Sequence, residues 1–183
     1  MRRILTDLSG KYPFLFFAGK FVLLYTCFTF LFQGYVGLLD PKGSYYWPIL
    51  SHADLIQLIL DLLKYPISWL LQLIGYDTRM YLTGVGILHG PGAQIAFPCL
   101  GIGIMITYVS LILAYPGKNK LLYLISGILL VHVLNIFRIF SIILIQLSSK
   151  NSFEMAHTVF NLLAYSGILL LFYRYTRKVK SIV

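Results

Sequence analysis

The sequence predicts an all-α polytopic membrane protein with about four transmembrane helices, an outer interfacial amphipathic helix and a short outer hairpin or loop. Two observations carry this prediction. Of the 183 residues, 58% are hydrophobic and only 11% are charged, and the mean hydropathy is +0.80. The apolar residues also gather in runs long enough to cross a bilayer. One compact unit accounts for this length, so residues 1–183 are expected to form a single integral membrane domain.

Four apolar runs are expected to span the membrane. They cover about residues 14–39, 101–115 with their flanks, 121–147 and 155–173. Residues 1–13 are short and polar, and no small-residue cleavage site follows them. We therefore expect the first run to be an anchor and not a removed signal peptide.

A fifth apolar run, residues 55–76, carries a polar stripe. Its polar residues recur every three or four positions, which places them on one side of a helix: Asp54, Gln57, Asp61, Lys64, Ser68 and Gln72. This pattern predicts an amphipathic helix that lies at the outer interface or packs its polar stripe toward the site. The alternative is a fifth crossing with the N-terminus outside, which would place the basic N-terminal residues on the wrong side.

Residues 77–98 are rich in glycine and end in proline. They are expected to form a short hairpin or an irregular outer loop, with Gly90-Pro91-Gly92 as its turn. This segment leads directly to Cys99.

The net charge of +9 comes from basic residues that flank the apolar runs. Basic flanks report orientation, so the charge predicts topology and not a nucleic-acid partner. Lys118 and Lys120 lie in a tight turn, and further basic residues follow the last run from Arg174 onward. Both regions and both termini are expected on the cytoplasmic side, which places Leu100 and Glu154 outside.

Cys99 is the candidate nucleophile. Pro98 suits the first position of a helix, so Cys99 is expected to open a helix that continues through Gly101 and Gly103. A helix N-terminus favours negative charge and would make Cys99 a reactive thiolate, and unpaired N–H groups of the first turn could stabilise an oxyanion. The alternative is a packing role, which is what we expect of Cys27. No Cys27–Cys99 disulfide is expected.

Arg138 is the most unusual residue of the apolar runs. Asn135 lies three positions earlier, so the two share one helix face and should point away from lipid. A charge in the membrane is costly, by roughly 2.5–3.5 kcal/mol on insertion scales. A water-filled cleft that opens outward would explain Arg138. The alternative is an arginine that binds backbone carbonyls and locks the helix bundle.

His157 lies one turn into the last run and shares a face with Glu154 and Asn161. Glu154 could orient the imidazole, which could act as a general acid and base. The alternative is a histidine that only packs between helices, the role that we expect of His132. No metal-ligand spacing links the histidines, and neither a metal nor a cofactor is expected.

Three motifs together resemble the exosortase/archaeosortase family, whose compact bacterial members this chain looks like. They are Phe97-Pro98-Cys99-Leu100-Gly101-Ile102-Gly103, Asn135-Ile136-Phe137-Arg138, and His157 at the start of the last run. Members of this family are polytopic cysteine transpeptidases whose Cys, Arg and His act together on the outer side of the cytoplasmic membrane. The resemblance covers about residues 55–175, the expected catalytic core. Leu100 departs from the serine that usually follows the cysteine.

The resemblance implies that Cys99 attacks the C-terminal sorting signal of an exported protein and forms a thioester. His157 would serve the leaving and acceptor amines, and Arg138 would stabilise thiolate or oxyanion charge. The implied partners are exported proteins with a hydrophobic tail and a basic end, an unknown surface acceptor with a lipid or glycan amine, and membrane lipid.

Two other functions fit parts of the pattern. Arg138, His157 and Asp61 could line the pathway of a small transport or proton-relay protein, although the polar residues gather in the outer half. A non-enzymatic assembly subunit would explain the helices but not the placement of Cys99.

Overall fold

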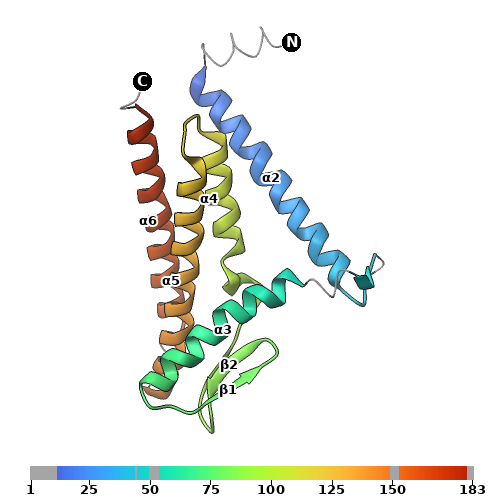
Figure 1. The fold of residues 1–183 in the computed structure, drawn as a ribbon, viewed down its shortest axis with the longest axis vertical. Helices are drawn as coiled ribbons and strands as arrows, with labels where there is room; N and C mark the ends of the chain where they lie inside the picture. Colours follow the sequence, from blue (N-terminus) through green and yellow to red (C-terminus); the bar gives the residue numbers. More distant parts are fainter. Residues whose placement is uncertain (1–11, 44, 50–53, 149–152, 181–183) are drawn as a thin grey trace.

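The computed structural model describes residues 12–43, 45–49, 54–148 and 153–180. Its elements in chain order are α2 (Pro13–Leu39), α3 (Leu55–Leu73), β1 (Thr78–Tyr81), β2 (Gly84–Ile87), β3 (Gly92–Gln94), the 3₁₀ turn η2 (Phe97–Leu100), α4 (Ile102–Ala114), α5 (Lys120–Ser148) and α6 (Phe153–Lys180). Helices α4, α5 and α6 stand side by side, α2 leans away from them, and α3 crosses below (Figure 1). The mostly helical architecture confirms the predicted class in its main feature.

All four apolar runs that were expected to span form helices. Within the described part of the chain, Pro13–Leu39 and Lys120–Leu147 are long and apolar enough to cross a membrane. Helix α4 has only 13 residues, fewer than the ~20 that a crossing needs. Two membrane-spanning helices therefore have support, and the number four stays a prediction.

Cys27 does not have the packing role that we expected, because its side chain is exposed on α2. No residue of α2 is buried inside the protein. A membrane supplies the apolar surroundings that a soluble protein must make from its own core, so an apolar helix in lipid can leave such a residue uncovered.

The two ends of the bundle differ in charge and in structure. The start of α2, the turn between α4 and α5 and the end of α6 share one end, whereas α3, the strands and η2 lie toward the other (Figure 1). The first end carries Lys118, Lys120 and Arg174. This is the end that the positive-inside rule predicts on the cytoplasmic side, and the orientation itself stays a prediction.

The predicted amphipathic helix is α3, and its polar stripe packs on the strands. Lys64 is 5% exposed and donates to the carbonyl oxygens of Tyr81 at 3.2 Å and Leu82 at 2.9 Å. Its ammonium also lies 2.8 Å from the Asp61 carboxylate. This hydrogen bond is the main cause that holds the pKa of Asp61 below its ordinary value. The buried cation thus ties α3 to the loop between β1 and β2.

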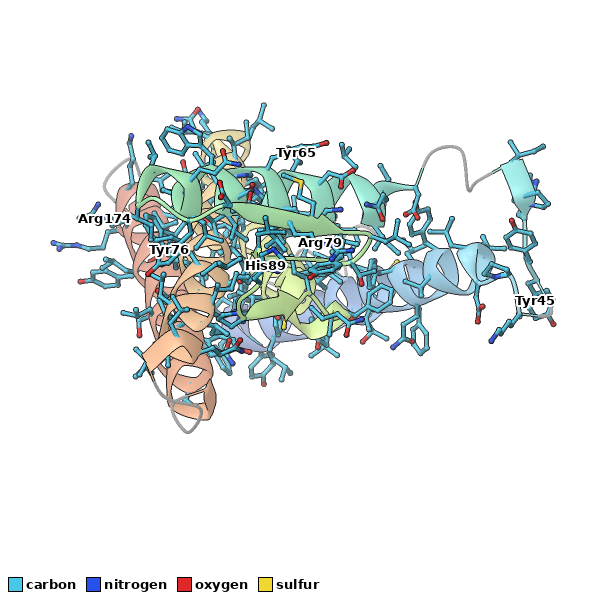
Figure 2. All side chains as sticks on the ribbon, turned by 90° about the horizontal axis from the view of Figure 1, so that it is seen from below. Tyr45, Tyr65, Tyr76, Arg79, His89 and Arg174 are labelled. Atoms are coloured by element: carbon cyan, nitrogen blue, oxygen red, sulfur yellow. The ribbon has the colours of Figure 1, made fainter. Side chains whose placement is uncertain are left out.

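The opposite stripe of α3 is apolar and uncovered. Its members are each more than half exposed: Leu55, Leu58, Leu62, Tyr65, Trp69 and Leu73. Tyr65 lies on the side of α3 away from the strands in the view from below (Figure 2). Burial of one stripe against protein and exposure of the other suits a helix at a membrane interface.

The glycine-rich segment forms more structure than the expected hairpin or loop. Its three strands make an antiparallel sheet in the order β1-β2-β3. The turn between β2 and β3 contains Gly90 and Pro91, as expected. A Cβ on Gly86 would meet the Cα of Gly92 at 2.7 Å, so glycine is required where β2 and β3 approach. The helical class therefore holds, and a small three-stranded sheet replaces the expected hairpin or loop.

One hydrophobic core joins the site elements. It contains Leu63 and Ile67 from α3, Val85 from β2, Leu100 from η2 and Ile143 from α5. A second core around Tyr108, at the other end, packs α4, α5 and α6 together. The first core fixes η2 between α3 and α5.

Candidate functional site

Cys99 lies in a 3₁₀ turn and does not open α4, which corrects the expected helix start. Pro98 is at the start of η2, as its ring favours, but η2 ends after Leu100. Gly101 then adopts φ +72°, a left-handed conformation, and α4 begins at Ile102. The N–H of Cys99 is donated to the carbonyl of Ala96 at 2.8 Å. This group is therefore committed to the turn and is not an open oxyanion donor.

Arg138 of α5 reaches η2 from the bundle. Its Nη2 donates to the carbonyl oxygen of Cys99 at 2.9 Å, and its Nη1 donates to Oδ1 of Asn161 at 3.2 Å. The side chain is 2% exposed. One guanidinium thus joins the turn of the candidate nucleophile to α5 and α6.

Asn135 binds the next carbonyl of the same turn. Its Nδ2 donates to the carbonyl oxygen of Leu100 at 3.1 Å, and Asn135 is 3% exposed. The predicted shared face of Asn135 and Arg138 is confirmed, since both point inward and hold consecutive carbonyls. Backbone binding is the alternative that the sequence left open for Arg138, and the carbonyl belongs to Cys99 itself.

The left-handed Gly101 is what allows Asn135 to approach the turn. A Cβ at this position would overlap Nδ2 of Asn135. The positive φ adds a penalty of about 1–3 kcal/mol for any residue with a side chain. Glycine is therefore required here for two independent reasons.

We expect Gly101→Ala to lower the unfolding temperature of the detergent-solubilised protein and to weaken the Asn135–Leu100 hydrogen bond. Gly103→Ala is the matched control, because a Cβ on Gly103 meets nothing within 4 Å. Alanine in a helix is also more favourable than glycine, by roughly 0.5–1 kcal/mol. Thermal unfolding of both variants checks the prediction. Equal unfolding temperatures for the two variants would contradict it.

A cavity of about 720 Å³ lies beside η2. The end of α2 contributes Val36, α3 contributes Gln57, and the outer sheet and its exit contribute Thr83, Gln94 and Leu100. Arg138 does not line it, so this cavity is not the cleft around the arginine that the sequence suggested. The sequence analysis missed these lining residues, because a cavity between segments distant in sequence leaves no local pattern.

His157 and Glu154 lie in α6. The structure describes their backbone but not their side chains. Asn161 follows His157 by four residues of the same helix, so the two positions share one side. Asn161 binds Arg138, which brings this side of α6 to the arginine. Asn161, which the sequence analysis grouped with His157, therefore contacts Arg138 directly.

Asp61 belongs to a different group of contacts. It accepts from Lys64 and, at 3.0 Å, from Nε2 of Gln57. Arg138 instead binds Cys99 and Asn161. The charged residues that a proton relay would link thus form separate networks in the described structure.

Comparison with known proteins identifies one family. A family model described as transmembrane exosortase matches residues 15–174, which is most of the chain. No curated protein and no solved structure matches it. The matched range includes Cys99, Arg138, His157 and all the contacts described above.

Proposed function

The chain belongs to the transmembrane exosortase family, and from this premise we propose that it is a membrane cysteine protease or transpeptidase with Cys99 as its nucleophile. Its substrates are the C-terminal sorting signals of exported proteins. The enzyme forms a thioester and then passes the protein to a surface acceptor amine or to water.

The observation that carries the proposal is the hydrogen bond from Arg138 to η2, the turn that contains Cys99. A buried arginine binds the carbonyl of Cys99 itself, and it is held in turn by Asn161 of α6. A structural lock could use any carbonyl of the bundle. Convergence of α5 and α6 on this residue supports preorganisation of the turn for chemistry.

The proposed reaction has two steps. His157 takes the proton of the Cys99 thiol, the sulfur attacks the scissile carbonyl carbon, the C–N bond breaks, and His157 gives that proton to the departing amine. His157 then takes a proton from an acceptor amine or water, which attacks the thioester, and the C–S bond breaks. The leaving thiolate takes the proton back from His157. Arg138 fixes the turn and places a positive charge near the negative charge that develops during both steps.

Leu100 replaces the serine usual in the family, and its surroundings support a purely structural role. The side chain is 2% exposed and belongs to the core shared by α3, the sheet and α5. Its carbonyl is the group that Asn135 binds. We propose that Leu100 anchors the turn and that the reaction needs no hydroxyl at this position.

The proposed location is the cytoplasmic membrane of a bacterium, with both termini inside and Cys99 outward. The basic residues at the end of the bundle opposite η2 support this orientation. The substrate tail would enter from the membrane and its cleavage site would reach the outer surface. The acceptor is a lipid or glycan amine at that surface.

We expect a thioester to accumulate when the purified protein in nanodiscs meets a reporter and no acceptor amine. The reporter is a soluble protein fused to the C-terminal tail of an exported protein encoded beside this chain. Intact mass should show the enzyme joined to the reporter without its tail, and neutral hydroxylamine should separate them, because it cleaves thioesters. A Cys27→Ala variant should form the same adduct. Cleaved reporter without any hydroxylamine-sensitive adduct would contradict covalent catalysis.

A further inference from the structure

A free strand edge leads from the outer sheet to Cys99. Strand β3 lies at one side of the sheet, and the chain runs from it through Ile95 and Ala96 into η2. The strands lie at the end of the molecule that α3 crosses (Figure 1). The exposed edge residues Gly92 and Gln94 therefore lie a few residues before the partly buried Cys99 in one continuous segment.

The pairing of β3 with β2 decides which backbone groups face outward. The N–H of Ile95 donates to the carbonyl of Thr83 at 2.7 Å. Hydrogen-bonded and non-bonded pairs alternate in an antiparallel ladder, so Ala93 is the next bonded residue. Gly92 and Gln94 belong to the non-bonded pairs. Their N–H and C=O groups therefore point away from β2, toward the free edge.

These outward groups are ready to accept another strand. Gly92 and Gln94 are exposed and lie two residues apart, which is the repeat of an extended chain. No hydrogen bond to their backbone groups is found within the part of the chain that the structure describes. An edge of this kind is the site of β-augmentation, in which a peptide adds a strand through main-chain hydrogen bonds.

The edge is continuous with the cavity beside η2. A second cavity, of about 390 Å³, lies over the sheet and includes Tyr81 and Gly92. Thr83 and Gln94 line both cavities. The larger cavity then extends along Ala96 and Phe97 to Leu100, the residue that follows Cys99. A chain that begins at the edge can therefore continue along hollowed surface to the turn that carries Cys99.

We propose that the free edge of β3 binds an extended segment of the substrate polypeptide as a fourth strand and so aligns its scissile bond with Cys99. The inference rests on the proposed function, since the bound segment is the substrate of Cys99. Main-chain pairing selects for an extended conformation, whereas the larger cavity selects the side chains that follow. The other edge, β1, offers the same kind of backbone groups but does not lead to η2.

Proline at position 94 tests the pairing. Gln94→Pro removes the outward N–H and keeps every bond between β3 and β2, because the lost group faces the free edge. We expect kcat/KM for the nanodisc reporter to fall about tenfold, the size of one lost hydrogen bond, with kcat kept at saturation. Gln94→Ala removes the same side chain but keeps the N–H, so it is the reference against which the tenfold loss of Gln94→Pro is measured. Met80→Pro places the same backbone change on the free edge of β1 and should match the wild type.

Cross-linking tests the bound conformation without catalysis. In a Cys27→Ala, Cys99→Ala background, Gln94→Cys is oxidised against single cysteines placed along the reporter segment. Alternate positions should form disulfides if the segment is a strand. A repeat of three to four positions, or no cross-link, would overturn the inference even if Gln94→Pro is slow. Equal kcat/KM for Gln94→Pro and Gln94→Ala would also overturn it and would leave the proposed function standing. If the wild type forms no thioester, the proposed function fails, and the cross-linking still decides whether the edge binds the segment.

Discussion

Replacement of Cys99 by alanine is expected to abolish processing of a co-expressed, tail-bearing reporter while membrane insertion stays intact. The thiol is the only group in the proposed reaction that forms a bond to the substrate, so no neighbour can take over its role. Loss of a nucleophile lowers a rate by at least about 1,000-fold in enzymes of this kind. Immunoblots of reporter from membranes, with and without its tail, measure the effect.

The matched control is the other cysteine. Cys27 lies exposed on α2, and Cys27→Ala should process the reporter at the wild-type rate. A maleimide that cannot cross membranes should label Cys99 in intact spheroplasts and block processing in the same experiment. Unchanged processing by Cys99→Ala would overturn the enzyme proposal. Labelling only after permeabilisation would instead overturn the topology.

The helices of this protein could be predicted from the sequence because their signals extend over many residues. Long apolar runs predicted α2 and α5, and six polar positions at helical spacing predicted α3. The same stripe did not reveal its partner. Only the structure shows that Lys64 binds the carbonyls of Tyr81 and Leu82, because that pairing joins residues from separate elements.

The outer sheet and η2 were harder to predict because they are short. Each strand has three or four residues, too few for an alternating pattern to stand out among glycines. Pro98 correctly indicated the start of a helical turn, but the turn ends at Gly101 after one short segment. A glycine permits both a continuing helix and a left-handed break, so the contact with Asn135 decides between them.

The sequence indicated which polar residues would lie together but not which atoms they would bind. Asn135, Arg138 and Asn161 were expected to face the site, and each takes part in the contacts at η2 or at Arg138. The sequence offered two roles for the arginine, charge stabilisation and carbonyl binding. The structure shows carbonyl binding, and the carbonyl belongs to the candidate nucleophile. Charge stabilisation stays a prediction.

Substitution of Arg138 separates these two roles. Arg138→Met removes the two hydrogen bonds that the guanidinium donates, to the Cys99 carbonyl and to Oδ1 of Asn161, and a hydrogen bond from a charged donor is worth about 1.5–3 kcal/mol. We expect a lower unfolding temperature and at least about 100-fold slower processing. A reacting group that is displaced by about 1 Å can lose this much in rate. Arg138→Lys keeps the charge, but one ammonium lacks the planar fork that serves both acceptors.

If the fork positions the turn, Arg138→Lys should be nearly as slow as Arg138→Met, and Asn161→Ala should show a smaller loss in the same direction. The rates must be compared at a temperature at which every variant is folded, so that instability does not count as lost chemistry. Processing by Arg138→Lys at the wild-type rate would mean that positive charge alone is sufficient. The hydrogen bonds to Cys99 and Asn161 would then be incidental. They would no longer support the proposal that Arg138 preorganises η2 for catalysis.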